Sequence, residues 1–255
     1  MRSAATIQHE YEMRHEEGMS DAHCHINLFD DPQAVVNSAR ESGVKTIVTA
    51  GGNLKDNLAV DRITSQLNIF GVIGIGPDVA AIEEHEIEKL KKTISQNKYI
   101  VGIGEVGLDF KISQDPDNIA AQKEVFIKQI ELSRELDVPL VIHARKAIRE
   151  VIGILIDESV EKAMFHFFEG GLDEARIAEK NGYLISIPPL HSAKRRRVIE
   201  NVEIGTLVAE TDAPVAGSIP NDVKKSIEYI AQIKGMSIDD VARKTSENVR
   251  EFFYI

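Results

Sequence analysis

The sequence contains a single cysteine, Cys24, and no long apolar run. One cysteine cannot form a disulfide within the chain, so this composition favours a reducing compartment, the cytoplasm. Because no stretch of about 18 apolar residues is present, we expect no membrane-spanning helix. Residues 1–18 are polar and charged and lack the apolar segment of a secretion signal. We therefore expect a cytoplasmic protein without a membrane partner.

An excess of positive charge is also missing, since 30 Lys and Arg stand against 41 Asp and Glu, for a formal net charge of −11. A protein that coats nucleic acid needs many Lys and Arg contacts to phosphates, so that class is disfavoured. A nuclease remains compatible, because bound metal ions can supply positive charge at its site. The one dense basic run, Lys194-Arg195-Arg196-Arg197, is either a solvated helix face or a substrate contact.

Internal repeats and low-complexity segments are absent as well. A chain of 255 residues with 43% hydrophobic content can bury a large core, and one barrel-sized domain accounts for nearly all of it. We expect this domain to span residues 19–255. Residues 1–18 are then an N-terminal appendage: a helical arm, a disordered tail or a start-site artefact.

Short β-branched segments alternate with longer amphipathic segments along the chain. The expected strands are residues 20–26, 46–50, 69–75, 100–105, 140–143, 163–167, 183–187 and 206–211. Helical periodicity covers 31–42, 54–66, 82–96, 119–136, 146–156, 173–180, 193–201 and 222–233. Ser237 is expected to cap a last helix that runs towards Arg250. Continuous apolar strands fit parallel strands covered on both faces. The pattern predicts an α/β fold, a single-domain (β/α)8 TIM barrel.

Two histidines one residue apart end the first expected strand, in the sequence Asp21-Ala22-His23-Cys24-His25. Side chains alternate along a strand, so His23 and His25 are expected on one face and Cys24 on the other. Two imidazoles on one face can bind one metal ion. A lone His-x-His is weak evidence, and the later strands strengthen it.

Four further candidate ligands follow later apolar segments, and each has a simpler explanation. Glu105 could be satisfied by helix-terminus amides, His143 and His166 could be hydrogen-bonded core histidines, and Asp212 could cap a helix or turn. Parallel strands bring their carboxyl ends together, so one shared site explains all of them at once.

Four imidazoles and two carboxylates exceed what one tetrahedral ion with an open position needs. They suit two ions about 3.5 to 4 Å apart. Glu105 could bridge them, and Asp212 could be both ligand and proton acceptor. Such a pair of ions acidifies a shared water and neutralises charge that develops on a phosphoryl or carbonyl oxygen. Mixed nitrogen and oxygen ligation is compatible with Mg, Mn or Zn.

The order of five motifs resembles the TatD family of metal-dependent deoxyribonucleases, within the amidohydrolase-like barrels. These motifs are His-x-His, GEVGLDF, IHAR, FHFF and ETDAP, and NVREFF resembles the family's C-terminal segment. The resemblance implies one metal held by His23, His25, Glu105 and Asp212, and a second held by Glu105, His143 and His166. It also implies that Asp212 is the general base and that Arg145 faces a substrate phosphate, for which a bidentate guanidinium is suited.

The sequence departs from the family pattern at two places near the expected site. Gly76 precedes Pro77 where the family usually has a histidine, and Phe167 and Phe168 follow His166 where serine and glycine are usual. These changes affect the substrate contacts rather than the expected ligands. By position alone, His191 and Lys194 could compensate as substrate-binding residues.

Three functions remain open on the sequence. The first, favoured by the resemblance, is hydrolysis of phosphodiester bonds at DNA ends or in a small phosphodiester, with Asp212 and Glu105 as the catalytic residues. The second is hydrolysis of a small amide, lactone or phosphotriester, although many such enzymes use a carboxylated lysine where this chain has Glu105. The third is a non-enzymatic metal-binding protein. The oligomeric state is left open.

Overall fold

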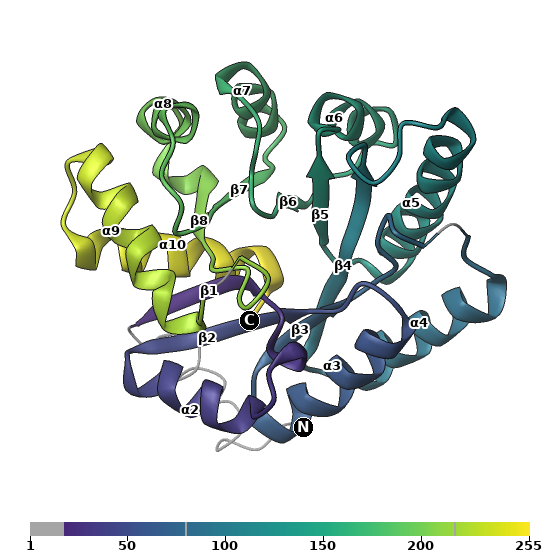
Figure 1. Ribbon diagram of the computed structural model, residues 1–255, viewed down its shortest axis with the longest axis horizontal. Helices are drawn as coiled ribbons and strands as arrows, with labels where there is room; N and C mark the ends of the chain where they lie inside the picture. Colours follow the sequence, from purple (N-terminus) through teal and green to yellow (C-terminus); the bar gives the residue numbers. More distant parts are fainter. Residues whose placement is uncertain (1–17, 80, 217) are drawn as a thin grey trace, which may run out of the picture.

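The structure, a computed structural model, describes residues 18–79, 81–216 and 218–255. The predicted appendage therefore lies outside the described residues, apart from Gly18. Eight parallel strands follow one another in chain order, which confirms the predicted TIM barrel (Figure 1). The strands are β1 (Met19–Cys24), β2 (Val44–Ala50), β3 (Phe70–Ile73), β4 (Ile100–Asp109), β5 (Leu140–Arg145), β6 (Ala163–Phe165), β7 (Leu184–Ile187) and β8 (Leu207–Ala209).

Helices surround the strands, and many of them begin where the sequence provides a cap. Side chains of Asp31, Asn53, Asp115 and Ser237 each accept a backbone N–H from the first turn that follows. The helices are α2 (Pro32–Glu41), α3 (Leu54–Leu67), α4 (Glu84–Gln96), α5 (Pro116–Leu136), α6 (Ile148–Asp157), α7 (Leu172–Lys180), α8 (Ala193–Asn201), α9 (Val223–Lys234) and α10 (Ile238–Phe253), with 3-10 turns η1 (Ile26–Leu28), η2 (Ile204–Thr206) and η3 (Pro220–Asp222). In the described ranges, no helix combines the length and apolar character needed to cross a bilayer.

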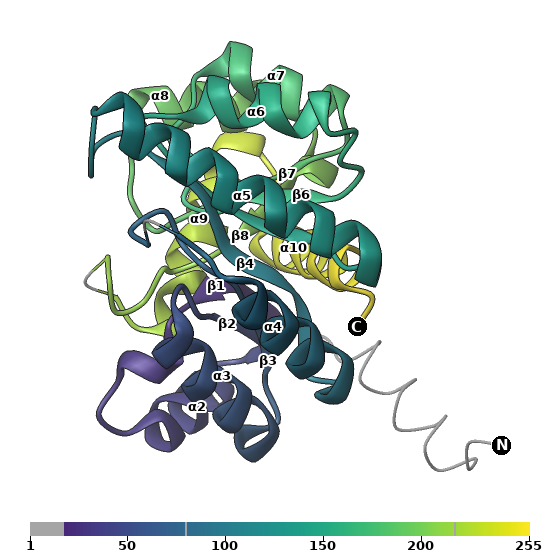
Figure 2. The ribbon, with the colours of Figure 1, turned by 90° about the vertical axis from the view of Figure 1, so that its right-hand side faces the viewer.

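Strand β4 continues beyond the end that the sequence pattern predicted at Glu105. It pairs with β5 as far as the partners Asp109 and Arg145, because the two strands keep parallel register there. Helices α4 and α5 both contact β4, and Figure 2 shows them on the same side of it. The longer strand places both Glu105 and Asp109 on one rigid element. Strands β6 and β8 are shorter than expected, so His166 directly follows β6 and Asp212 lies three residues beyond Ala209, the last residue of β8.

The barrel interior is filled by small and branched side chains, and one helix closes its amino end. Val48, Val72, Val141 and other inward residues form a buried cluster with Phe252 and Phe253 of α10. Helix α10 contacts β1 and β8, as its position across these strands in Figure 1 shows. The carboxyl ends of the strands lie opposite to this closed end.

Backbone and side-chain hydrogen bonds join the end of β8 to β1. Asp212 donates its N–H to the carbonyl oxygen of His23 over 2.9 Å. Thr211 donates from its backbone N–H and its hydroxyl to the two carboxylate oxygens of Asp21, over 2.9 and 2.6 Å. Burial raises the pKa of Asp21 to about 7, although the hydrogen bonds from Thr211 act in the opposite direction. This closure brings Asp212 beside the first strand.

Gly107 offers a test of the β4–β5 pairing, and Gly153 of α6 is the control. Gly107 has a φ of 137°, and a Cβ there would lie 2.1 Å from the carbonyl oxygen of His143. Gly107→Ala should lower the free energy of unfolding by at least about 2 kcal/mol, through strain and overpacking. Gly153→Ala, where a Cβ in α6 meets open space, should raise it by about 0.5 to 1 kcal/mol. Urea unfolding measures both, and a Gly107→Ala protein of parental stability would contradict the described pairing.

Candidate metal centre

Six candidate ligands gather at the carboxyl ends of five strands. They line or lie directly beneath a cavity of about 470 Å³ whose walls include His25, Glu105, His143, His166 and Asp212. His23 is fully buried beneath it, at 0% exposure. The residues that the sequence singled out one strand at a time therefore meet in one place, as expected for a parallel barrel.

Glu105 lies at the centre of the group, with its two carboxylate oxygens turned to different partners. Its Oε1 lies 2.5 Å from His143 Nδ1 and 2.7 Å from His166 Nε2. Its Oε2 lies 3.6 Å from Nε2 of both His23 and His25. One carboxylate thus faces two separate sets of imidazoles.

The first set consists of His23, His25 and Asp212, whose ligand atoms lie within 4.8 Å of one another. Asp212 Oδ1 is 3.6 Å from His23 Nε2 and 3.3 Å from His25 Nε2. Ligands of a tetrahedral ion with bonds of about 2.1 Å lie about 3.4 Å apart, so these spacings match. Nδ1 of His25 lies 3.0 Å from the carbonyl oxygen of Ala50, which leaves Nε2 available to the site.

The second set consists of Glu105, His143 and His166, also within 4.8 Å of one another. His143 Nδ1 and His166 Nε2 are 3.1 Å apart and share Glu105 Oε1. The other ring nitrogen of His143, Nε2, lies 3.0 Å from Asp109 Oδ2. A carboxylate behind a histidine in this way fixes the orientation and tautomer of the ring.

The charges of the cluster shift the pKa values of its members. Burial opposes ionisation of Glu105, yet the charge of His166 and hydrogen bonds from His143 hold its pKa well below the usual value. Burial also acts against the charged form of His143, but hydrogen bonds to Asp109 and Glu105 raise its pKa to about 10. For His23, burial dominates and lowers the pKa to about 4. The group therefore combines carboxylates that stay ionised with a histidine that must release a proton to bind a metal.

Several polar atoms of the cluster lack partners. Among the described residues, His23 Nε2 and Asp212 Oδ1 are buried without a hydrogen bond. Such atoms are costly to bury unless something satisfies them. The set of imidazole nitrogens and carboxylate oxygens has the chemistry of a divalent-metal site, and a metal ion would satisfy both atoms.

Two acidic residues that the sequence reasoning did not assign take part in the surroundings of the ligands. Asp109 supports His143, as described above. Glu210 is fully buried and forms a third group with His23 and His166 within 4.8 Å. Its Oε1 accepts the N–H of Phe167 over 2.5 Å, and burial raises its pKa well above the usual value. In the sequence, the only sign of these roles was that Asp109, in GEVGLDF, and Glu210, in ETDAP, are acidic residues at the end of apolar segments.

The predicted substrate-binding residues lie in different surroundings. Arg145 lines the metal cavity, whereas His191 and Lys194 are not among the described residues that line it. The ring of His191 stacks on Tyr229 at 3.8 Å between centroids, and Lys194 Nζ donates to the carbonyl oxygen of Glu169. At Gly76, a Cβ would lie 3.7 Å from the backbone oxygen of Glu105, so the family's missing histidine would adjoin the site.

The contact between Asp109 and His143 leads to a prediction. Asp109→Asn should weaken uptake of one divalent ion by about 10- to 100-fold, because the amide no longer holds His143 with Nδ1 free to bind. Titration of the metal-free protein with Zn²⁺ or Mn²⁺ in a metal buffer measures the affinity. Asp157→Asn, at an exposed position at the end of α6, is the control. Unchanged affinity in Asp109→Asn would mean that this carboxylate does not orient a ligand.

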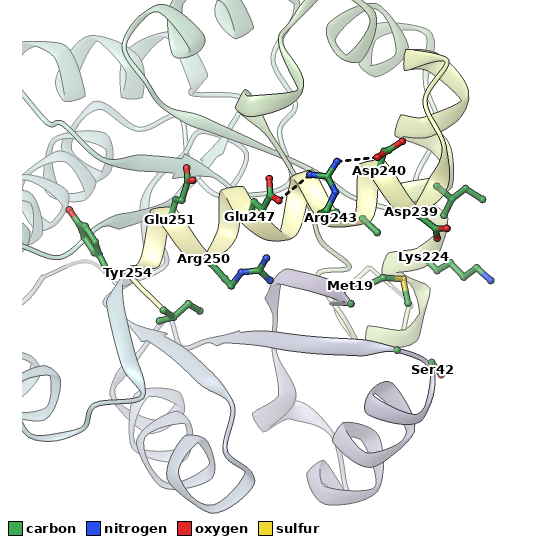
Figure 3. Close-up of a pocket in the computed structure, with 15 residues that line it drawn as sticks. Met19, Ser42, Lys224, Asp239, Asp240, Arg243, Glu247, Arg250, Glu251 and Tyr254 are labelled. Atoms are coloured by element: carbon green, nitrogen blue, oxygen red, sulfur yellow. Dashed lines mark hydrogen bonds and ion pairs between the residues drawn. The ribbon is translucent and has the colours of Figure 1, made fainter. Parts of the chain in front are cut away.

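A larger hollow, of about 1140 Å³, lies at the opposite end of the barrel, beside the first residues of β1 and the turn before β2. Figure 3 shows its wall along α10, where Arg243 pairs with Asp240 and Glu247 at 3.0 and 3.1 Å. No histidine is found among the described residues that line it. In the part of the chain that the structure describes, this hollow has none of the groups of potential metal ligands that the smaller cavity has.

Known proteins resemble this chain over nearly the whole barrel. The family model described as TatD related DNase matches residues 20–254. The "Uncharacterized metal-dependent hydrolase MJ1582" of Methanocaldococcus jannaschii is 34% identical over 245 residues, which cover 91% of this chain and 96% of that protein. The deoxyribonuclease TATDN3 of Homo sapiens is 28% identical, over 92% of this chain and 94% of that protein.

A solved structure shares the fold. The crystal structure of YJJV, a TatD homolog from Escherichia coli, matches with a TM-score of 0.86 at 21% identity, covering 93% of this chain and 98% of that one. Because the family model spans nearly the whole described barrel, including every strand that brings a residue to the candidate metal centre, this chain belongs to the TatD-related family of metal-dependent hydrolases.

Proposed function

We propose that this protein is a deoxyribonuclease that hydrolyses phosphodiester bonds at DNA ends with the help of two divalent metal ions. The observation that carries the proposal is Glu105, whose two oxygens face two different sets of ligand atoms. Two ions held on either side of this carboxylate would suit hydrolysis of a phosphodiester, because two-metal sites stabilise both the attacking and the leaving oxygen. The name of the human relative, a deoxyribonuclease, supports the same substrate class.

His23, His25, Glu105 and Asp212 would hold one ion, and Glu105, His143 and His166 the other. Mg, Mn or Zn is compatible with this mixture of nitrogen and oxygen atoms. When bound, the ions would lower the pKa of a water in the cavity and offset negative charge on the phosphoryl group. Glu210 belongs to a group with His23 and His166; its Oε1 accepts from Phe167, whereas its Oε2 is buried without a hydrogen bond among the described residues and would be available to these rings or to an ion.

The remaining chemistry belongs to two residues of the cavity wall. Burial opposes ionisation of Asp212, but the ring of His25, whose Nε2 lies 3.3 Å from Oδ1, and the other nearby imidazoles bring its pKa below the usual value. Asp212 is therefore ionised at neutral pH and can accept a proton from the attacking water. Arg145 reaches the same cavity and can hold a phosphate with two N–H donors.

The test compares three substrate classes on protein loaded with Mg²⁺, Mn²⁺ or Zn²⁺. We expect stepwise shortening of a labelled single-stranded DNA, loss of this activity on chelation, and its return when metal is restored. A lactone and a phosphotriester serve as the alternative substrates. Turnover of either one with an intact DNA strand would reject the nuclease in favour of another hydrolase, and no turnover of any substrate would favour a metal-binding protein without activity.

A further inference from the structure

Two further hollows continue from the metal cavity along the outside of the barrel's carboxyl end. A middle hollow of about 400 Å³ shares Ile148 and Glu169 with the metal cavity. An outer hollow of about 420 Å³ shares Phe110 and Lys146 with the middle one. The three hollows therefore adjoin one another in a row, which we call the basic groove.

Pairing between β4 and β5 brings the walls of the basic groove together. Asp109 and Arg145 are register partners, and Phe110 donates its N–H to the carbonyl oxygen of Arg145 over 3.0 Å. The residues that follow, Lys111 and Lys146, consequently leave the two strands at the same edge. Both line the outer hollow, together with Phe110.

Three cations along the groove have no carboxylate partner in the described ranges. Arg145, Lys146 and Lys111 are exposed, and within the described part of the chain no carboxylate lies at ion-pair distance from any of them. Among the described residues, none that lines the outer hollow is acidic. In the middle hollow, Glu150 pairs with Lys123 and Glu174 with Arg149, and Glu169 stands near Lys194, whose Nζ donates to its carbonyl oxygen. On a chain with a net charge of −11, the outer hollow is a local reversal of sign.

Phe110 adds an aromatic surface between the cations. Its side chain is only partly buried, against the core on one side and the outer hollow on the other. An aromatic ring between Lys and Arg side chains is the combination that holds single-stranded nucleic acid, since bases stack on the ring and phosphates meet the cations. Double-stranded DNA keeps its bases inside the stack and would not use the ring.

We propose that the basic groove binds the unpaired strand that continues from the phosphodiester at the metal centre. Arg145 meets the phosphate at the site, Lys146 and Lys111 meet phosphates further along the strand, and Phe110 stacks on a base between them. The proposal rests on the proposed function and extends it, because it makes the substrate a single strand of several nucleotides rather than a small phosphodiester.

The experiment compares Lys111→Gln/Lys146→Gln with a control, Lys92→Gln/Lys180→Gln, which removes the same charge from exposed positions of α4 and α7 outside the groove. Metal-loaded protein is assayed on a dinucleotide and on a single strand of about a dozen nucleotides. We expect the parent and the control to favour the longer strand, and the groove variant to reduce the ratio of the two kcat/KM values by about tenfold. Phe110→Leu, which keeps the packing but not the ring, should reduce the ratio less.

Binding is measured separately, by fluorescence anisotropy of a strand with hydrolysis-resistant phosphorothioate linkages. Each lost phosphate contact lowers the salt slope of binding by about 0.7, so the groove variant should show a slope smaller by about 1.4. Equal ratios and slopes in the groove variant and the control would overturn the groove while leaving the nuclease intact. If the groove variant shows the smaller salt slope but no protein cleaves the strand, the groove proposal stands and the proposed nuclease activity is rejected. Equal displacement of the strand by polyglutamate would overturn the assignment to nucleic acid.

Discussion

Replacing Glu105 with Gln is expected to leave a folded barrel that retains at most one of two metal ions and loses turnover by at least about 10³-fold. The carboxamide offers one neutral oxygen, so it cannot serve both sets of imidazoles that now face Oε1 and Oε2. A factor of 10³ corresponds to about 4 kcal/mol of lost transition-state stabilisation, which is what the loss of one ion would cause.

The fold should survive this substitution because the cluster can release its charge. In the metal-free protein, Glu105 is one of the groups that raise the pKa of His143 to about 10. Without the carboxylate, His143 can lose its proton rather than remain buried and charged. The core of the barrel lies in other residues, so circular dichroism and thermal unfolding should resemble those of the parent.

Elemental analysis after reconstitution measures the ions retained, and Glu200→Gln, at an exposed position of α8, is the matched control. Two ions and near-normal turnover in Glu105→Gln would reject the bridge. An insoluble or molten protein would instead show that Glu105 is required for folding. No more than one ion in the reconstituted parent would reject the two-metal site itself.

The second large effect concerns the general base. Asp212→Asn should reduce kcat by about 10²- to 10⁴-fold, because Asn retains an oxygen that can contact a metal but cannot accept a proton. Arg145→Ala should reduce the rate less and also raise KM, since a phosphate contact acts in the ground state as well as in the transition state.

Steady-state kinetics on a short single-stranded oligonucleotide with Mg²⁺ or Mn²⁺ separates the two roles, with the metal content of each variant measured alongside. Arg145→Lys is the control for the guanidinium, because it keeps the charge but loses the bidentate hydrogen bond. Its KM should therefore lie between those of the parent and Arg145→Ala. Near-normal turnover of metal-loaded Asp212→Asn would remove Asp212 as the base and leave it, at most, a ligand.

The order of elements was predictable from the sequence because it depends on residues that are neighbours in the chain. Apolar periodicity and caps such as Asn53 and Ser237 report local conformation, and strand–helix alternation admits few arrangements other than a parallel barrel. The convergence of the six candidate ligands follows from the same logic, since the carboxyl ends of barrel strands meet. Their assignment to two metal ions stays a prediction.

Strand ends were less predictable. The interpretation of Glu105 as the last residue of its strand was wrong, because β4 continues while its pairing with β5 lasts, and that pairing depends on a segment about forty residues away. The roles of Asp109 and Glu210 depend on the same long-range packing. Each is an acidic residue in an apolar segment, and nothing local distinguishes a carboxylate that supports a histidine from one that caps a turn.

The barrel, the family resemblance and the residue types of the candidate metal centre could be inferred from the sequence, since apolar periodicity and motif order are local features of the chain. Which atoms meet depends on tertiary packing: His143 turns Nδ1 towards Glu105 and Nε2 towards Asp109, and His191 stacks on Tyr229. It also brought Lys111 beside Lys146. These contacts depend on strand register and side-chain direction, which are set when distant segments pack together.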